Sequence, residues 1–186
     1  MIDLVCMSNN KTIEEILASM NNLSKAQMEE NERTFYECKK YIDMKPELWP
    51  DFELLWDTSP EHYIHTVDGY NEESYKKHFP NGLQLGYVSF TELNNKLATH
   101  CVRTQDKIWE LGSTQKLAKA ILHWTEKKAM TPILIGFYKE DLIIGGGFHR
   151  HAVCIIKKPE TIPILIEPSD KERLEKLLSI EWNTKK

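Results

Sequence analysis

The 186-residue sequence has only four cysteines, and they are far apart. Because Cys6, Cys38, Cys101 and Cys154 form no CxxC pair, neither a structural zinc site nor a disulfide framework is predicted. No apolar stretch is long enough to span a membrane, and Met1–Met7 lacks the basic leader and sustained apolar core of a signal peptide. No internal repeat or low-complexity tract occurs. We therefore expect a soluble, cytoplasmic globular protein that has no membrane partner.

Charge is distributed unevenly between the two halves of the chain. Residues 1–84 hold 8 basic and 16 acidic side chains, a net charge of −8, whereas residues 85–186 hold 16 basic and 12 acidic ones, a net charge of +4. An acidic half argues against wrapping the protein along a nucleic-acid backbone, which needs clustered Lys and Arg. The positive excess of the second half fits a local anion site. The alternative is two ordinary solvated surfaces of unlike sign.

The first half, residues 1–84, is predicted to be helical and rich in aromatic residues. Apolar residues recur at helical spacing from Lys11 to about Tyr41, and Ser24 can cap a second helix there, so a helical hairpin is the simplest interpretation. Residues 45–81 contain four prolines among many aromatic side chains. Prolines break long helices, and so many aromatic residues are poorly tolerated in a free linker. We expect short helices and loops that pack on residues 85–186.

The second half, residues 85–186, alternates between strand and helix patterns. Strands are predicted at 86–90, 132–138, 142–144 and 161–166. Helices are predicted at 91–97, at 113–128 with Ser113 or Thr114 as the cap, and from His149 to about 156. A final amphipathic helix should begin near Ser169 and bury Leu174, Leu177 and Leu178. This order predicts an α+β (mixed α/β) fold.

The most informative motif is a run of three glycines before a helix. The predicted strand at 142–144 leads into Gly145, Gly146 and Gly147, and a helix opens at His149. The glycines would then leave the free backbone N–H groups and the positive end of the helix dipole accessible to a ligand. This arrangement favours anion binding. Arg150 adds a guanidinium suited to phosphate, and His149 can donate a hydrogen bond or transfer a proton. The alternative is a tight turn, with Arg150 paired to a surface carboxylate.

The same motif resembles the ParB/sulfiredoxin superfamily over about residues 86–168. Sulfiredoxins have Gly-Gly-Cys-His-Arg, an alanine-containing helix and a Thr-Ile-Pro strand, and ParB-like domains have a helix that ends before a Pro-Ile strand. The matching residues here are Gly146-Gly147-Phe148-His149-Arg150, Ala152, Thr161-Ile162-Pro163 and Thr131-Pro132-Ile133. The resemblance implies a small mixed sheet with flanking helices in residues 85–186. It also implies a nucleoside triphosphate ligand, ATP or CTP, with Mg²⁺, bound by Gly145, Gly146, Gly147, Phe148, His149, Arg150 and Lys116.

One departure from the family pattern limits the chemistry. The sulfiredoxin nucleophile is the cysteine of the motif, and this chain has Phe148 at that position. A phenyl ring is no nucleophile, so reduction of a sulfinic acid is not expected. Cys154 lies on the apolar run of the following helix, where we expect a buried, inert thiol.

The residues leave three functions open. The leading interpretation is a nucleotide-binding protein that transfers a phosphoryl group to an unidentified acceptor or hydrolyses the nucleotide, with His149 and Glu110 as candidate catalytic residues; Asp106 and Glu140 are further candidate bases. The second is a non-catalytic protein in which nucleotide occupancy switches contacts between the halves or with a protein partner. The third, a ParB-like nuclease or DNA-associated factor, is disfavoured by the acidic first half. No protein-held metal site is predicted, because His149 and His151 point to nearly opposite faces of their helix.

Overall fold

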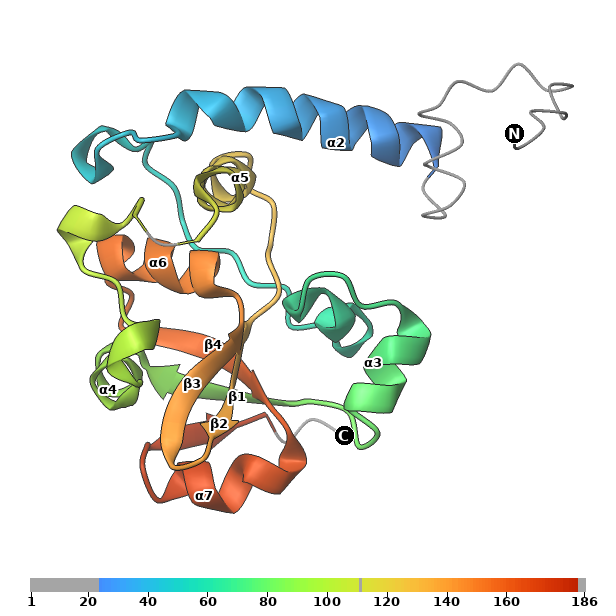
Figure 1. The fold of residues 1–186 in the computed structure, drawn as a ribbon, viewed down its shortest axis with the longest axis vertical. Coiled ribbons are helices and arrows are strands. Elements are labelled where there is room, and N and C mark those ends of the chain that lie inside the picture. The colour runs from blue at the N-terminus through green and yellow to red at the C-terminus, as the bar shows by residue number, and fades with distance from the viewer. Residues whose placement is uncertain (1–23, 111, 184–186) are drawn as a thin grey trace, which may run out of the picture.

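The computed structural model describes residues 24–110 and 112–183 and confirms the α+β class (Figure 1). The α-helices are α2 (Lys25–Glu37), α3 (Glu72–His78), α4 (Phe90–Lys96), α5 (Thr114–Thr125), α6 (Phe148–Lys157) and α7 (Lys171–Glu175). The strands are β1 (Gln84–Ser89), β2 (Ile133–Tyr138), β3 (Asp141–Gly146), β4 (Thr161–Ile166) and β5 (Ile180–Trp182). Short 3₁₀ helices are η1 (Cys38–Tyr41), η2 (Pro46–Leu48), η3 (Pro60–Thr66), η4 (Thr99–Cys101), η5 (Gln105–Lys107) and η6 (Pro168–Asp170). In the described part of the chain, no helix has the length and apolar character needed to cross a membrane.

The five strands form one small mixed sheet in the order β3-β2-β4-β1-β5. Strand β4 lies at the centre, antiparallel to β1 and parallel to β2. The parallel pair is joined by a connection that contains the hairpin strand β3 and helix α6, as a parallel pairing requires a crossover. The N-terminus of α6 therefore follows directly from the end of β3, at the edge of the sheet.

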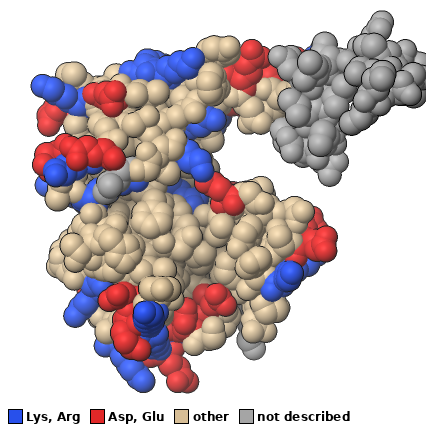
Figure 2. Space-filling view, viewed as in Figure 1, with Lys and Arg blue, Asp and Glu red and all other residues tan. Residues whose placement is uncertain are grey.

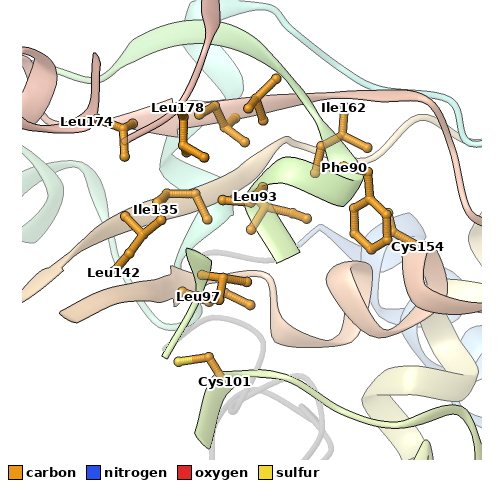
Figure 3. Packing of buried hydrophobic residues seen from close by; sticks show 14 of the residues in the cluster. Phe90, Leu93, Leu97, Cys101, Ile135, Leu142, Cys154, Ile162, Leu174 and Leu178 are labelled. Carbon is orange, nitrogen blue, oxygen red and sulfur yellow. The ribbon is translucent and has the colours of Figure 1, made fainter. Parts of the chain in front are cut away.

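Alternating side chains divide the sheet into two apolar faces. In β4, Ile162, Ile164 and Ile166 belong to one buried cluster, whereas Leu165 belongs to another. This is the period of two that a pleated strand produces. The isoleucine face is covered by helices α4, α6 and α7, and Figure 3 shows Phe90 and Leu93 of α4 among the side chains packed there.

The opposite face of the sheet is covered by the first half of the chain. Leu165 and Leu134 are buried with Tyr63 of η3, and the aromatic rings of Tyr75 and Phe79 from the α3 segment pack against them. Burial of this kind contributes about 25 cal/mol per Å² of apolar surface. The leucine face therefore depends on residues that precede β1.

A second junction between the halves is built around Trp124 of α5. Its indole Nε1 donates a hydrogen bond to the Leu55 carbonyl at 2.9 Å. Its ring lies 6.3 Å from the Phe52 ring, stacked, and 5.4 Å from the Trp56 ring, edge-on. Because Trp124 is 1 % exposed, the aromatic segment of the first half supplies much of its environment.

Several element boundaries agree with the sequence predictions and others correct them. Ser24 caps α2, as predicted, and it also forms a capping box with Gln27. The preceding predicted helix from Lys11 lies outside the described residues. Ser113 caps α5. The final helix α7 is only five residues long, and Leu177 is 37 % exposed, which contradicts its predicted inward position. Strand β5 was not predicted.

Candidate functional site

Helix α6 begins at a glycine that no other residue could replace without strain. Gly147 is the N-cap and has φ 89°, in the left-handed region. A Cβ atom there would also lie 2.7 Å from the Arg150 guanidinium. Gly147 has no side chain that could accept a hydrogen bond from the first N–H groups of α6. The positive end of the helix dipole therefore has no acceptor from the cap residue. The helix was predicted to open at His149, and the structure begins it one residue earlier, at Phe148.

The other two glycines have different positions from the predicted loop. Gly145 and Gly146 lie in strand β3, and Gly146 pairs with Leu134. Gly146 is buried, and a Cβ there would lie 2.4 Å from the Thr66 carbonyl oxygen. The absence of a side chain therefore lets the first half of the chain approach the sheet. Of the three glycines, Gly147 is the one that lines the pocket at the start of α6.

Arg150 is a buried cation that is held by neutral oxygens. Its side chain is 7 % exposed, and it donates hydrogen bonds to the Thr66 carbonyl, at 2.8 Å, and to the Thr131 hydroxyl. Burial lowers its pKa to about 10, so the guanidinium stays charged at neutral pH. Among the described residues no carboxylate is in direct contact with it. The alternative of a surface ion pair is therefore wrong.

A pocket of about 320 Å³ opens at the N-terminus of α6, where Gly147, His149 and Arg150 line it. Its other walls come from α5, from the segment after α5 and from the end of η3. Figure 2 shows the molecule hollowed between α2 and α5 above and the segment of η3 and α3 below, and basic and acidic side chains meet at the inner end of the hollow. The remaining lining residues are His65, Asp68, Lys116, Lys119, Ala120, His123 and Met130.

Helix α5 presents one face to this pocket. Lys116, Lys119, Ala120 and His123 are spaced by three, four and seven residues, so they share a helix face. The predicted Lys116 thus lies at the site, where its Nζ donates to an oxygen of Asp68. Lys119 adds a second ammonium group. Ala120, on the same face of α5, lines the pocket with a small side chain.

The histidine of the motif is neutral at physiological pH. Burial is the main cause that lowers the pKa of His149 to about 4, and the charges of Arg103 and Lys116 add to it. Its Nε2 atom is buried and, within 24–110 and 112–183, has no hydrogen-bond partner. A neutral imidazole can still donate or accept one hydrogen bond.

Besides Gly145 and Gly146, two further predicted site residues do not line the pocket. Glu110, the predicted catalytic acid or base, is exposed and lies 3.9 Å from Lys107 Nζ, and it does not line the pocket. Phe148 is 37 % exposed and does not line the pocket either. Cys154 is fully buried, and burial raises the pKa of its thiol, which confirms the expectation of an inert core cysteine.

The sequence interpretation missed two residues of the first half, His65 and Asp68. Neither belongs to a motif, and only the packing of η3 beside α6 brings them to the pocket. In the described ranges no group of three or more His, Cys, Asp or Glu side chains could hold a metal ion. Asp68 is the one carboxylate among the described residues that line the pocket.

His151, two residues after His149, should make the free energy of unfolding depend on pH. We expect stability to fall as the pH drops from about 6.5 toward 4, because His151 is buried and neutral in the folded state. Burial, with a contribution from Arg103, lowers its pKa to about 4, whereas an unfolded chain has a histidine pKa of about 6.5. The unfolded state therefore binds the proton first, at a cost of about 2 kcal/mol at pH 5. Urea unfolding at neutral pH and at about pH 5 measures this loss.

The variant His151→Phe removes the titrating group and keeps an aromatic ring beside Phe90, whose centroid is 5.5 Å away. Its free energy of unfolding should depend less on pH than that of the wild type. The exposed His100, changed to Gln, is the control and should keep the full dependence. An unchanged pH dependence in His151→Phe would assign the effect to other groups.

Comparison with protein-family models, with curated proteins and with solved structures found no match to this chain.

Proposed function

We propose that this chain binds a nucleotide, ATP or CTP, through its phosphates in the pocket at the N-terminus of α6, as a ParB/sulfiredoxin-like protein. The observation that carries the proposal is the convergence of a free helix N-terminus with the cations of Arg150, Lys116 and Lys119 on one pocket. A helix N-terminus supplies N–H donors and a positive dipole end to phosphate oxygens. Charge-assisted hydrogen bonds from guanidinium and ammonium groups add to this binding.

The pocket has a size and composition that suit a phosphate-bearing ligand. Its volume of about 320 Å³ lies at the lower end of the range for small-molecule sites. Arg150 is already fixed by Thr66 and Thr131, so little side-chain entropy is lost when it meets an anion. His149, being neutral, can donate to a phosphate oxygen without adding charge.

A second candidate function is a nucleotide-switched binding protein without turnover. It is favoured by the lining of the pocket, since His65 and Asp68 come from the first half of the chain and the other lining residues from the second. Occupancy would then act on the contact between the halves. Phosphoryl transfer requires a carboxylate or a metal ion near the phosphates. Asp68 is the carboxylate among the described residues that line the pocket, so it is the candidate for this position. A steady-state assay of nucleotide hydrolysis, with and without Mg²⁺, separates the two functions.

Calorimetric titration with ATP, CTP and inorganic pyrophosphate tests the binding itself. Wild-type protein should bind at least one of them, and Lys119→Ala should weaken the affinity about tenfold or more, because a charge-assisted contact is worth roughly 1.5–3 kcal/mol. Lys119 is a better test residue than Arg150, whose loss would leave the Thr66 carbonyl without its donor. Affinity for none of these anions would contradict the proposal.

The matched control is Lys107→Ala. Lys107 is an exposed lysine away from the pocket, 3.9 Å from a carboxylate oxygen of Glu110, and its loss changes the net charge equally. The affinity of this variant should stay within about twofold of the wild type, as expected for a screened surface charge. An equal weakening in both variants would point to a nonspecific charge effect.

A further inference from the structure

The pocket holds a negative charge as well as cations. Among the described residues that line it, Asp68 is the one acidic side chain, beside Lys116, Lys119 and Arg150. A carboxylate at this position repels a ligand phosphate, so it does not add to an anion site. We therefore look for a role of Asp68 other than binding the anion.

Asp68 engages a lysine that a ligand phosphate would use. Its Oδ2 accepts a hydrogen bond from Lys116 Nζ, and this bond is the main cause that lowers the pKa of Asp68, so the carboxylate is charged at neutral pH. The Asp68 side chain is 77 % exposed and that of Lys116 52 % exposed. Exposed ion pairs of this kind are weak because water and salt screen them. The pair can therefore open at little cost.

The backbone around Asp68 allows its carboxylate to leave. Val67 before it is extended, and Gly69 after it has φ 81° with no atom within 4 Å of a Cβ position. Lys116 is the only hydrogen-bond partner of the Asp68 carboxylate in the described part of the chain. Arg150, by contrast, is fixed by two hydrogen bonds in the buried interior. A rotation of Asp68 would free Lys116 and leave the rest of the site unchanged.

We propose that Asp68 is an internal competitor for the anion site: it neutralises Lys116 in the empty pocket and releases it when a ligand phosphate binds. The proposal rests on the proposed function, since it assigns a regulatory contact to the same pocket. Asp68 belongs to the segment between η3 and α3, whereas Lys116 belongs to α5. The first half of the chain therefore sets the affinity of the site. Lys116 can contact a ligand phosphate only when its ion pair with Asp68 is open. Any contact that moves the Asp68 segment away from Lys116 therefore raises the affinity of the pocket for the anion.

The variant Asp68→Asn tests the proposal in the full-length chain. Asparagine keeps the shape of the side chain and removes the charge that competes for Lys116. Titration with ATP and with inorganic pyrophosphate, in the presence of EDTA, should give dissociation constants about three- to tenfold lower than those of the wild type, the scale of a lost exposed pair plus relieved repulsion. Thermal unfolding without ligand checks that the variant folds as the wild type does.

The matched control is Asp51→Asn, which removes another exposed carboxylate paired with a lysine. Asp51 Oδ1 lies 3.4 Å from Lys157 Nζ, and neither residue lines the pocket. Its dissociation constants should stay within about twofold of the wild type. An equal gain in both variants would overturn the proposal, because net charge alone would then explain it.

Three further outcomes would also overturn it. Unchanged or weaker binding in Asp68→Asn, with wild-type protein binding normally, would refute the competitor role and leave the proposed function intact. Weaker binding seen only when Mg²⁺ replaces EDTA would make Asp68 a contact of the nucleotide-bound metal instead. If neither protein binds either anion, the proposed function fails together with the inference.

Discussion

A fragment that contains only residues 83–186 should not fold into a stable structure. It would expose the leucine face of the sheet around Leu134 and Leu165, which is now covered by residues of η3 and α3. It would also remove the Phe52 and Trp56 rings and the Leu55 carbonyl from Trp124. Because a domain is stable by only roughly 5–15 kcal/mol, we expect the loss of these apolar contacts to leave the fragment unfolded or aggregated.

Circular dichroism and urea unfolding of the fragment and of the full chain measure this effect. The full chain should unfold in one cooperative transition, and the fragment should show either no transition or an aggregated state. A fragment that unfolds cooperatively and binds ATP with the affinity of the full chain would contradict the prediction. It would also contradict the competitor role of Asp68, which the fragment lacks.

Replacing Gly146 with alanine should destabilise the protein by about 3 kcal/mol or more. The new Cβ would lie 2.4 Å from the Thr66 carbonyl oxygen, a backbone atom that cannot rotate away. Either η3 or β3 must shift, and the shift disturbs the hydrogen bond from Arg150 to the same oxygen. Overpacking at a rigid contact costs about 1–3 kcal/mol, and the damaged hydrogen bond adds to it.

The control is Gly136→Ala in the adjacent strand β2. A Cβ there would meet only Asp170 Oδ2, at 3.8 Å, which is an ordinary contact. Its free energy of unfolding, measured in urea, should equal or slightly exceed that of the wild type, because alanine has less chain entropy to lose than glycine. Equal stability of Gly146→Ala and the wild type would show that the approach of η3 to β3 does not constrain position 146.

Much of the fold could be predicted because its elements have strong local signals. Ser24 and Ser113 are good caps, and the alternation of Ile162, Ile164 and Leu165 is that of a strand covered on both faces. Strand β5 could not be predicted, because three residues show no periodicity and its pairing with β1 comes from tertiary packing. The same limit applies to Leu177, which follows a helix too short to form a face.

The residues alone predicted the part of the candidate site that is adjacent in the sequence, because Gly147, His149 and Arg150 form one local motif at a helix start. Lys116 lies far from this motif in the sequence and was expected because the resemblance to the ParB/sulfiredoxin superfamily implies it. Asp68 enters the pocket through a long-range approach that no local pattern records. Glu110 was chosen for its chemistry, and the structure turns it toward solvent beside Lys107.

The order of strands in the sheet has a consequence for how fast the chain folds. Strand β1 lies between β4 and β5, and its pairing joins Ser89 with Thr161 and Gln84 with Ile166. These contacts close a long loop that includes α4, α5, the β2–β3 hairpin and α6. The conformational entropy of that loop is lost when β1 pairs with its neighbours in the sheet. Chains dominated by such distant pairings fold slowly for their size. The hairpin of β2 and β3, whose partners are neighbours in the sequence, can form early, whereas β1 joins the sheet only after β4 has been synthesised.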